Sequence, residues 1–522
     1  MPPAAPSRSI LPAETDVLVV GGGINGCGIA RDLSGRGVRV LLCEQHDLAA
    51  HTSSASTKLI HGGLRYLEYG ELGLVRKALV EREVLLNMAP HLIEPLRFVM
   101  PHDPSMRPAW MIRLGLWLYD HLARRRWLPA TEALDLHHDP AGAVLQPQWR
   151  RAFAYADGWV DDARLVVLNA LDAARRGATI LTRTRCTALQ RGPHDWQATL
   201  ADEAGHTWTV RARVVVNAAG PWAEQLLRNQ AGLSPQRHLR LVRGSHLVVP
   251  RRAGHETAYL LQARDRRVLF AIPYEQRYTL IGTTDVEHHG DPASARATPD
   301  EIDYLCREAN RYLRQPVSPQ EVLWSYSGVR PLLDDGADPS AVTRDYLLDW
   351  DERGGAGLLT VWGGKITTYR TLAQQAVRRL APILGIPATP DWTAHAPLPG
   401  GDLQAVVGPC ASPMQARQRF EQHLRQRWPW LPAALPARWT RAYGTLALDW
   451  LHDARRLDDL GAEIAPGLFE AELHHLVRQE WARDADDILW RRSKLGLHSE
   501  PQAHAAVQRW LQSQSQRHHA PG

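Results

Sequence analysis

The sequence predicts an α/β plus α+β protein with a Rossmann-like domain, an antiparallel β-rich domain and an all-α C-terminal domain. Three observations lead to this fold class. A strand, a glycine turn, a helix and a second strand follow one another within residues 16–44. Short β-like runs divided by turn residues fill residues 239–281. After about residue 390, proline-rich joints alternate with helical stretches. These patterns are typical of a βαβ unit, an antiparallel sheet and a helical domain.

The predicted elements follow in chain order. Residues 1–15 form a Pro- and Ala-rich, disordered lead. A strand at 16–20, a helix to 34 and a strand at 38–44 come next, and Pro90 closes a helix at 71–88. The remaining expectations are β-like runs at 239–242, 246–249, 268–272 and 278–281, a strand at 358–362, a helix from about 365, and C-terminal helices at 414–428, 469–482 and 502–512.

Length and composition set the broad class of the protein. The 522 residues are enough for two or three domains, and 44% hydrophobic and 22% charged residues are ordinary globular values. A net charge of +5 is a small excess for this length and is weak evidence for nucleic-acid binding. Because the five cysteines form no CxxC pair, we expect neither a disulfide framework nor a metal site. We expect neither a secretory signal nor a membrane-spanning helix, because residues 1–16 have no apolar core and no apolar stretch reaches about 18 residues.

A glycine-rich turn follows the first strand and opens a helix. The run from Gly21 to Gly26 matches GxGxxG, and in this context it indicates an adenine-dinucleotide site. Gly21 permits the tight turn, Gly23 lets the backbone approach a pyrophosphate, and Gly26 allows close helix–strand packing. Glu44, at the end of the next strand, is expected to accept hydrogen bonds from a ribose. The alternative is an ordinary glycine turn with a surface glutamate.

Three further segments are suited to contact such a cofactor. The hydroxyl-rich run Thr52–Lys58 is either a solvated loop or a binder of the second phosphate and ribityl chain. Val214–Trp222 is a buried strand ending in a turn of small residues, which lets a ligand approach the backbone. Gly363–Thr368 opens a helix directly after a strand, so its amides are placed to stabilise negative charge.

Several long motifs occur in order from about residue 14 to beyond residue 490. They resemble the motifs of the aerobic, FAD-dependent glycerol-3-phosphate dehydrogenases, within the wider group of amino-acid-oxidase-like flavoproteins. The motifs are Ser53–Leu67, Gly244–His246, Ile281–Asp285, Tyr326–Pro331, Gly363–Tyr369, Glu470–Leu473 and Ala485–Arg492.

The resemblance implies an FAD-binding domain interwoven with a substrate or cap domain. The expected FAD-binding pieces are residues 14–100, 155–235 and 325–385, and the cap is expected over residues 236–324. Residues 101–154 are expected to form a peripheral amphipathic segment, and residues 390–515 the helical C-terminal domain.

The resemblance also implies a reaction. Glycerol 3-phosphate would lose hydride from C2 to flavin N5 and become dihydroxyacetone phosphate, with the electrons passing to membrane quinone in glycerol or glycerophospholipid catabolism and aerobic respiration. The expected cofactor is FAD, held without a covalent bond. The chain is expected in the cytoplasm, as a peripheral protein on the inner face of the cytoplasmic membrane, without nucleic acid; a homodimer is left open.

Catalysis requires a base and a site for a dianionic phosphate. His246 is predicted to be the general base, because an imidazole titrates near the working pH. His61 is the rival base, and a histidine that is merely buried in the core is the structural alternative. Arg330 is expected to act at the C2 oxygen. The predicted substrate-binding residues are Arg65, Tyr66, Thr284, Arg330 and Lys365.

The predicted cofactor-binding residues combine these motifs with the resemblance. Cys186 is included for its backbone, because its thiol is expected to be inert. The full set is Gly21, Gly23, Ile24, Asn25, Gly26, Glu44, Thr52, Ser53, Ser54, Ser56, Lys58, His61, Gly62, Cys186, Ala218, Gly220, Trp222, Gly328, Gly364, Lys365, Ile366, Thr367 and Thr368.

Residues 107–129 form a distinct amphipathic stretch. Trp110, Leu114 and Trp117 fall on one apolar face at helical spacing, with arginines around it. This pattern is typical of a helix that lies at a lipid surface, but it equally fits a helix docked on its own protein. The resemblance favours the lipid surface.

Other functions remain open at this stage. A glycerol-3-phosphate oxidase would use oxygen in place of quinone. An amine or amino-acid oxidase of the same fold would need a site for a carboxylate and show no phosphate preference. An RNA-interacting flavoprotein would use the basic excess to contact phosphates.

Overall fold

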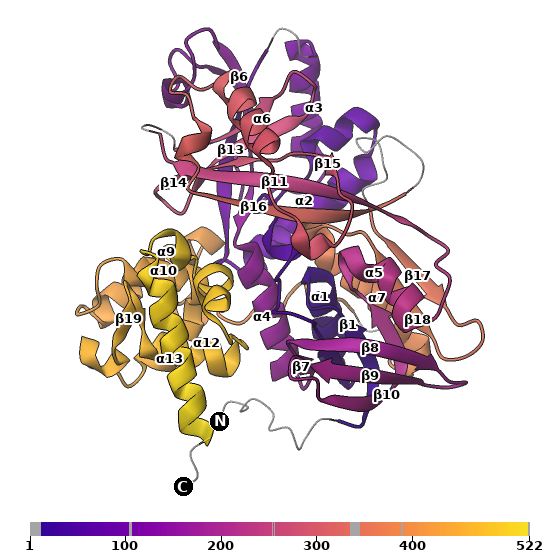
Figure 1. Cartoon of the computed structure of the whole chain (residues 1–522). Coiled ribbons are helices and arrows are strands. Elements are labelled where there is room, and N and C mark those ends of the chain that lie inside the picture. Colours follow the sequence, from indigo (N-terminus) through magenta and orange to yellow (C-terminus); the bar gives the residue numbers. More distant parts are fainter. Residues whose placement is uncertain are drawn as a thin grey trace.

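The computed structural model describes residues 12–103, 107–252, 254, 256–334, 345–387 and 390–519. These residues form two large sheets and a helical C-terminal domain, which lies beside helix α4 (Asp162–Arg175) in Figure 1. The fold class is therefore confirmed. Residues 1–11 of the predicted lead lie outside the described residues.

The first sheet has eight strands and contains the predicted βαβ unit. Its strand order is β17-β18-β10-β1-β2-β7, and β9 pairs with both β10 and β8. Strands β18, β10, β1, β2 and β7 are parallel, and β17 is antiparallel to β18. The strands are β1 (Glu14–Val20), β2 (Val40–Cys43), β7 (Thr179–Leu181), β8 (Thr184–Arg191), β9 (Trp196–Asp202), β10 (Thr207–Asn217), β17 (Leu347–Asp351) and β18 (Leu358–Trp362).

Helices α1 (Ile24–Ser34), α4 and α7 (Tyr369–Leu384) pack together against this sheet. The approach of α1 to α7 depends on Gly28, because a Cβ atom there would lie 2.7 Å from the ring of Tyr369. The buried strands are nearly continuous in hydrophobic residues, as expected for a parallel sheet covered by helices. The short helical segment Ala223–Gln225 (α5) follows β10.

The second sheet has ten strands and is mostly antiparallel. Its order is β15-β11-β14-β13-β12-β4-β6-β3, with β16 paired to β11 and β5 paired to β6; only β12 and β4 form a parallel pair among the described residues. The strands are β3 (Leu59–Ile60), β4 (Ile93–Pro101), β5 (Glu132–Asp135), β6 (Arg151–Val160), β11 (Leu239–Pro250), β12 (Ala258–Gln262), β13 (Val268–Tyr274), β14 (Tyr278–Gly282), β15 (Val286–Glu287) and β16 (Trp324–Leu333).

The second sheet takes strands from several of the predicted domain pieces. Strands β4 and β16 lie in the predicted FAD-binding pieces 14–100 and 325–385, yet they pair with cap strands. Residues 101–154 supply the largely exposed strand β5, the first residues of β6 and helix α3 (Ala109–His121). The pairing partners are far apart in the sequence, and local periodicity does not identify them. For the same reason two predicted β-like runs turn out to be one strand, β11, paired along its length with β16.

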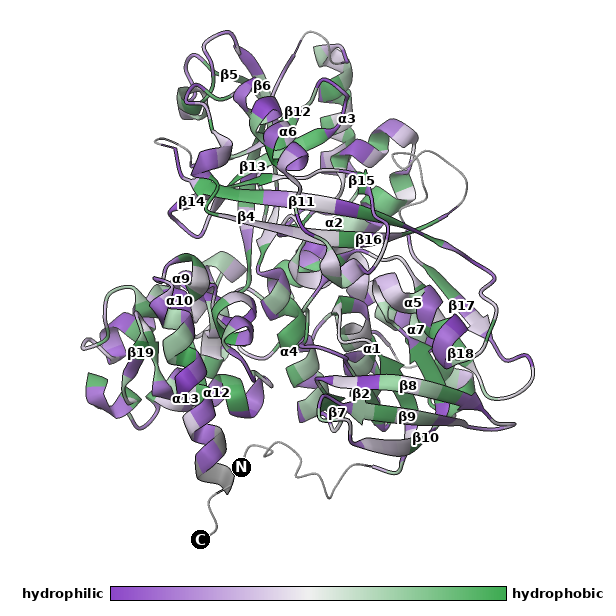
Figure 2. Ribbon diagram, in the orientation of Figure 1, coloured by the Kyte–Doolittle hydropathy of each residue, from purple (hydrophilic) through white to green (hydrophobic). Residues whose placement is uncertain are grey.

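Two helices accompany the second sheet, α2 (Leu72–Met88) and α6 (Pro299–Asn310). The C-terminal domain shares a hydrophobic core with α4, and Figure 2 shows hydrophobic stretches on α4 and α12. It also contains a small hairpin, β19 (Glu463–Ala465) and β20 (Leu468–Phe469). Its helices are α8 (Gln404–Val407), α9 (Pro413–Arg427), α10 (Leu435–Tyr443), α11 (Leu448–Leu451), α12 (Glu470–Gln479) and α13 (Gln502–His519).

Candidate active site

A cavity of about 960 Å³ lies between the two sheets. Its wall includes Gly21, Glu44, Ala218 and Gly363, which follow the parallel strands β1, β2, β10 and β18. Ligands of open α/β sheets bind outside the carboxyl ends of the strands, so the cavity occupies the expected position. Residues of β11 and β16 line its other side, and this volume suits a large ligand.

The glycine turn and Glu44 form one end of this cavity. Gly21 has φ +116°, and a Cβ atom there would lie 2.4 Å from the carbonyl oxygen of Ala218. The Glu44 carboxylate accepts hydrogen bonds from the backbone N–H groups of Gly22 at 2.7 Å and His46 at 2.8 Å. Burial raises the Glu44 pKa, and these two hydrogen bonds oppose the rise. A glycine cradle at a helix N-terminus with an acidic residue beside it fits an adenine dinucleotide.

The loop after β18 closes another side of the cavity. Gly363 and Gly364 have φ values of +73° and +105°, which favour glycine. The Asn25 side chain donates a hydrogen bond to the carbonyl of Gly363 at 3.1 Å, which joins the loop to α1. Thr367 Oγ1 accepts a hydrogen bond at 3.2 Å from the backbone N–H of His61. The glycine-rich segments thus converge, and together they fit a dinucleotide cofactor.

Three predicted cationic residues, Arg65, Arg330 and Lys365, line the same cavity. Arg330 pairs with Asp285 at 2.9 Å. The Lys365 ammonium lies 3.9 Å from the centroid of the Tyr66 ring. Arg65 forms no ion pair with any described residue. The cavity wall therefore carries the positive charge that a phosphate dianion requires.

His246 lines the cavity from β11 and is almost fully buried. Its Nε2 lies 3.0 Å from Thr57 Oγ1, and its ring stacks on Tyr326 with centroids 4.8 Å apart. Nδ1 is enclosed and has no hydrogen-bond partner in the described part of the chain. Burial, followed by the charges of Lys58 and Arg330, holds the His246 pKa well below its usual range. The imidazole is therefore neutral and able to accept a proton at neutral pH.

Most of the predicted site residues line this cavity, but some do not. Lys58 is instead a buried ion-pair partner of Asp162, with Nζ–Oδ2 at 2.8 Å. Thr284 directs its hydroxyl to Glu301 at 2.7 Å. Both side chains are paired with buried carboxylates, of Asp162 and Glu301 respectively. The predicted residues outside the cavity lining are Gly26, Ser54, Lys58, Gly62, Thr284 and Thr368.

Sequence reasoning also missed residues that line the cavity. Thr57 lies inside the hydroxyl-rich run, but its contact with His246 depends on chain folding. His51 lies outside the predicted set; its Nε2 lies 2.9 Å from His46 Nδ1, and burial, followed by the charge of His46, lowers its pKa to about 4. Asp157 comes from β6, and Arg82 neutralises it at 2.6 Å. No local motif marks His51 or Asp157.

Comparisons with known proteins identify relatives over the whole chain. The family model of FAD dependent oxidoreductases matches residues 16–370, and that of the C-terminal domain of alpha-glycerophosphate oxidase matches residues 392–518. A D-erythritol 1-phosphate dehydrogenase from Brucella abortus is 49% identical over 502 residues, covering 96% of this chain and 98% of that protein. The aerobic glycerol-3-phosphate dehydrogenase of Escherichia coli K12 is 46% identical over 500 residues, covering 95% and 97%.

Solved structures agree with these relationships. A glycerol-3-phosphate dehydrogenase from Bacillus halodurans, complexed with FAD, matches with a TM-score of 0.75 and 27% identity, covering 96% of this chain and 90% of that chain. A glycine oxidase from Geobacillus kaustophilus shares the fold, with a TM-score of 0.52 and 22% identity over 71% of this chain and 98% of its own. The chain therefore belongs to the FAD-dependent oxidoreductase family and is an FAD enzyme with a helical C-terminal domain.

Proposed function

We propose that this enzyme oxidises sn-glycerol 3-phosphate to dihydroxyacetone phosphate. The observation that carries the proposal is the meeting of a neutral, buried histidine with three cationic side chains in one cavity of an FAD-dependent fold. The substrate itself is suggested by relatives named glycerol-3-phosphate dehydrogenase that are 46–48% identical.

The residues divide into a cofactor side and a substrate side. The glycine turn from Gly21, Glu44 and the loop Gly364–Thr367 would hold FAD, which when bound accepts the hydride from C2 of the substrate. Arg65 and Lys365 bind the phosphate, for which Arg65 has no competing ion pair among the described residues. Arg330 lies against the C2 oxygen and favours its anionic form.

The C2 hydroxyl also loses a proton, and His246 accepts it. Nε2 is the nitrogen that takes up this proton, because Nδ1 is enclosed. The Thr57 hydroxyl, 3.0 Å away, accepts a hydrogen bond from the substrate and passes its own proton to Nε2. His61 is the rival base because it lines the same cavity.

A second substrate is suggested by the relative that is 49% identical and named D-erythritol 1-phosphate dehydrogenase. A four-carbon polyol phosphate presents the same phosphate and secondary alcohol, so the same constellation serves it. Anaerobic mixing of the purified yellow protein with each compound separates the two proposals. We expect rapid bleaching of the flavin absorbance with glycerol 3-phosphate and a lower specificity constant with D-erythritol 1-phosphate. Bleaching by neither compound contradicts both proposals.

We further propose that the electrons pass to quinone at the membrane surface, to which helix α3 docks. The side chains of Trp110, Leu114 and Trp117 are 66%, 51% and 54% exposed. The opposite face of α3 carries Leu116 and Tyr119, which are buried in the protein. Contact with the protein therefore covers only one face of α3, and the exposed apolar face favours an external apolar partner.

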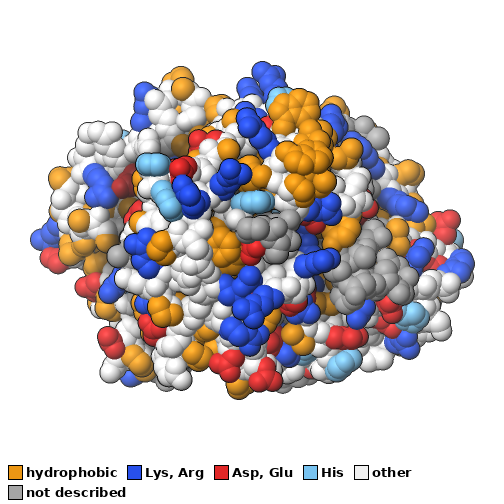
Figure 3. Space-filling view, turned by 90° about the horizontal axis from the view of Figure 1, so that it is seen from above, with side chains coloured by type: hydrophobic (Ala, Val, Ile, Leu, Met, Phe, Trp, Pro, Cys, Tyr) orange, Lys and Arg blue, Asp and Glu red, His pale blue; other side chains and the backbone are white. Residues whose placement is uncertain are grey.

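Basic side chains surround this exposed face. Figure 3 shows hydrophobic side chains together with Lys and Arg side chains on the face of the molecule that includes α3. Arg113 and Arg124 form no ion pairs within the described residues, and they are placed to contact anionic headgroups. Within the same residues, no helix combines the length and apolar character needed to cross a bilayer. Peripheral attachment on the cytoplasmic side of the membrane is the arrangement that we propose.

The acceptor is tested by comparing oxygen with a quinone. We expect quinone reduction in the presence of glycerol 3-phosphate to be much faster than peroxide formation. Peroxide formed in equal yield and at an equal rate identifies the enzyme as an oxidase instead.

A further inference from the structure

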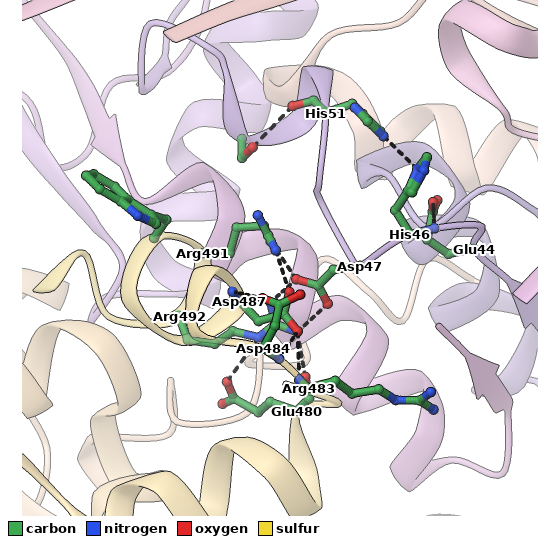
Figure 4. Close-up of polar contacts among 12 residues, drawn as sticks. Glu44, His46, Asp47, His51, Glu480, Arg483, Asp484, Asp487, Arg491 and Arg492 are labelled. Atoms are coloured by element: carbon green, nitrogen blue, oxygen red, sulfur yellow. Dashed lines mark hydrogen bonds and ion pairs between the residues drawn. The ribbon is translucent and has the colours of Figure 1, made fainter. Parts of the chain in front are cut away.

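One segment of the C-terminal domain contacts residues of the cavity wall but does not itself line the cavity. None of the described residues after Thr367 contributes to the cavity wall. The segment Glu480–Arg492 nevertheless reaches the loop Glu44–Ser53, which lines the end with the glycine turn. Figure 4 shows Arg491 and Arg492 meeting Asp47 of this loop.

Asp47 is the point of attachment. Its carboxylate is 2% exposed and accepts hydrogen bonds from Arg491 Nε at 2.6 Å and from Arg492 Nη1 at 2.5 Å and Nη2 at 2.8 Å. Arg492 also donates to the backbone carbonyl of Glu480 at 2.6 Å, so its own position is determined by the C-terminal domain. Two arginines on one buried carboxylate form a rigid joint.

The neighbouring wall of the cavity is held by the same segment. The Arg183 side chain pairs with Asp484 at 2.5 Å and with Asp487 at 2.9 Å. The backbone N–H of Arg183 donates to the carbonyl of His46 at 2.7 Å, and that of Thr184 donates to the carbonyl of Glu44 at 2.7 Å. Thr184 and the two residues after it line the cavity. Two segments of the cavity wall are therefore attached to residues 484–492. The loop after β2 is attached through Asp47, and the start of β8 is attached through Arg183.

The position of Asp47 matters because Glu44 lies three residues before it. Glu44 is half-buried, and its two carboxylate oxygens accept hydrogen bonds from the backbone N–H groups of Gly22 and His46. A movement of Asp47 is transmitted through this short loop to those hydrogen bonds. Removing an arginine leaves a buried carboxylate without full compensation beside the site for an anionic cofactor.

We propose that Arg491 and Arg492 are positioning residues for FAD, acting through Asp47 on the wall that receives the adenine half of the cofactor. The helical C-terminal domain thereby contributes to FAD retention, although it does not contact the cavity. This inference rests on the proposed placement of the adenine half beside Glu44.

FAD affinity of the full-length apoprotein tests the proposal. The variants are Arg491→Gln, Arg492→Gln and Asp47→Asn, titrated with FAD by fluorescence quenching. We expect each to raise the Kd by about tenfold or more, since a buried charge loses its partner. Combining Asp47→Asn with Arg491→Gln should add little to either change, because both act through one joint.

Arg441→Gln provides the matched control. Arg441 also belongs to the C-terminal domain and pairs with the buried Glu275, which lies in the turn after β13 and not in the cofactor wall. Its removal loosens the junction between domains without touching Asp47. We expect its FAD Kd to stay near that of the wild type. Equal loss of FAD affinity in the Arg441→Gln and Arg491→Gln proteins overturns the proposal, as does full additivity with Asp47→Asn.

Arg492 is fully buried, and its replacement can prevent folding. In that case the test uses the partly exposed Arg491. FAD affinity is measured in Arg491→Gln, together with hydrogen exchange of peptide 44–53 in the holoenzyme. Faster exchange in this peptide supports the proposal, and unchanged exchange in Arg491→Gln contradicts it. The Glu44→Gln variant distinguishes the placement of the adenine half of FAD from the positioning role of Arg491. If Glu44→Gln leaves FAD affinity intact, the placement of the adenine half is wrong; if it weakens FAD while Arg491→Gln does not, only the positioning role fails.

Discussion

Thr57 Oγ1 lies 3.0 Å from His246 Nε2, although the two residues are 189 positions apart in the chain. Both residues line the cavity, and the other ring nitrogen of His246 is enclosed. The hydrogen bond therefore selects the nitrogen that exchanges protons with a bound substrate.

Thr57→Val removes this hydrogen bond and keeps the shape of the side chain. We expect the rate of flavin reduction by glycerol 3-phosphate to fall by about tenfold or more, because the relay and the orientation of the imidazole are both lost. Stopped-flow absorbance under anaerobic conditions measures this rate. Thr57→Ser keeps the hydroxyl and should retain most of it. A Thr57→Val enzyme as fast as the wild type contradicts the relay.

His246→Asn removes the proposed base. The reduction rate should fall by about 10²- to 10⁴-fold, with a much smaller change in substrate Kd. His61→Asn is the matched comparison, since His61 lines the same cavity. If the loss is confined to His61→Asn, then His61 is the base.

The wild-type pH profile reports the same group. Burial lowers the His246 pKa well below 6.5, so the base remains unprotonated as the pH falls through 6.5. We therefore expect the reduction rate to hold level between pH 8 and about pH 6 and to decline only at lower pH. A reduction rate that already declines with an apparent pKa near 6.5 contradicts this prediction.

Arg65→Ala tests the phosphate site. Arg65 lines the cavity and has no ion pair among the described residues, so its loss leaves no protein charge unpaired. We expect the Kd for glycerol 3-phosphate to rise by about 10- to 100-fold, the worth of a charge-assisted hydrogen bond to phosphate. The dependence of the anaerobic flavin reduction rate on substrate concentration, measured by stopped-flow absorbance, gives this Kd. Arg353→Ala, at an exposed turn, should leave it unchanged.

Replacing Trp110 and Trp117 by serine tests the docking face of α3. Both side chains are more than half exposed, so the fold should tolerate the change. Flotation with phosphatidylglycerol vesicles should decline strongly, and flavin reduction by glycerol 3-phosphate should persist. Leu323→Ser, an equally exposed residue outside α3, serves as the control. Unchanged flotation of the double variant indicates that another surface binds the lipid.

His91 should make stability sensitive to acid. It is fully buried, both ring nitrogens lack hydrogen-bond partners among the described residues, and burial lowers its pKa to about 3. The unfolded chain therefore binds a proton near pH 6.5 that the folded chain does not, so stability is lost as the pH falls below 6.5. Between pH 7.5 and 5.5 this amounts to about 1 kcal/mol of unfolding free energy.

Urea unfolding at pH 7.5 and 5.5 checks this contribution. In His91→Gln the loss of stability between the two pH values should be smaller by that amount. If the wild type and His91→Gln lose the same unfolding free energy between the two pH values, His91 does not cause this loss.

The parts of the molecule that the sequence predicts are those determined by interactions between residues close together in the chain. The turn Gly21–Gly26, the strand 358–362 and helix 71–88 follow from glycine geometry and from hydrophobic periodicity, which act within a few residues. Strand pairing has no such local signature. Residues 101–154 are predicted to be peripheral, and they supply β5 and the first residues of β6 to the second sheet.

The sequence by itself determined the dinucleotide cradle, the cationic residues Arg65, Arg330 and Lys365, and the family resemblance. Tertiary structure alone decided which residues meet. In the folded chain Thr57 lies within hydrogen-bond distance of His246, Lys58 pairs with Asp162, and Arg491 pairs with Asp47. The physical reason is that a buried polar group must find a partner, and in a folded chain that partner is set by packing and not by distance along the sequence.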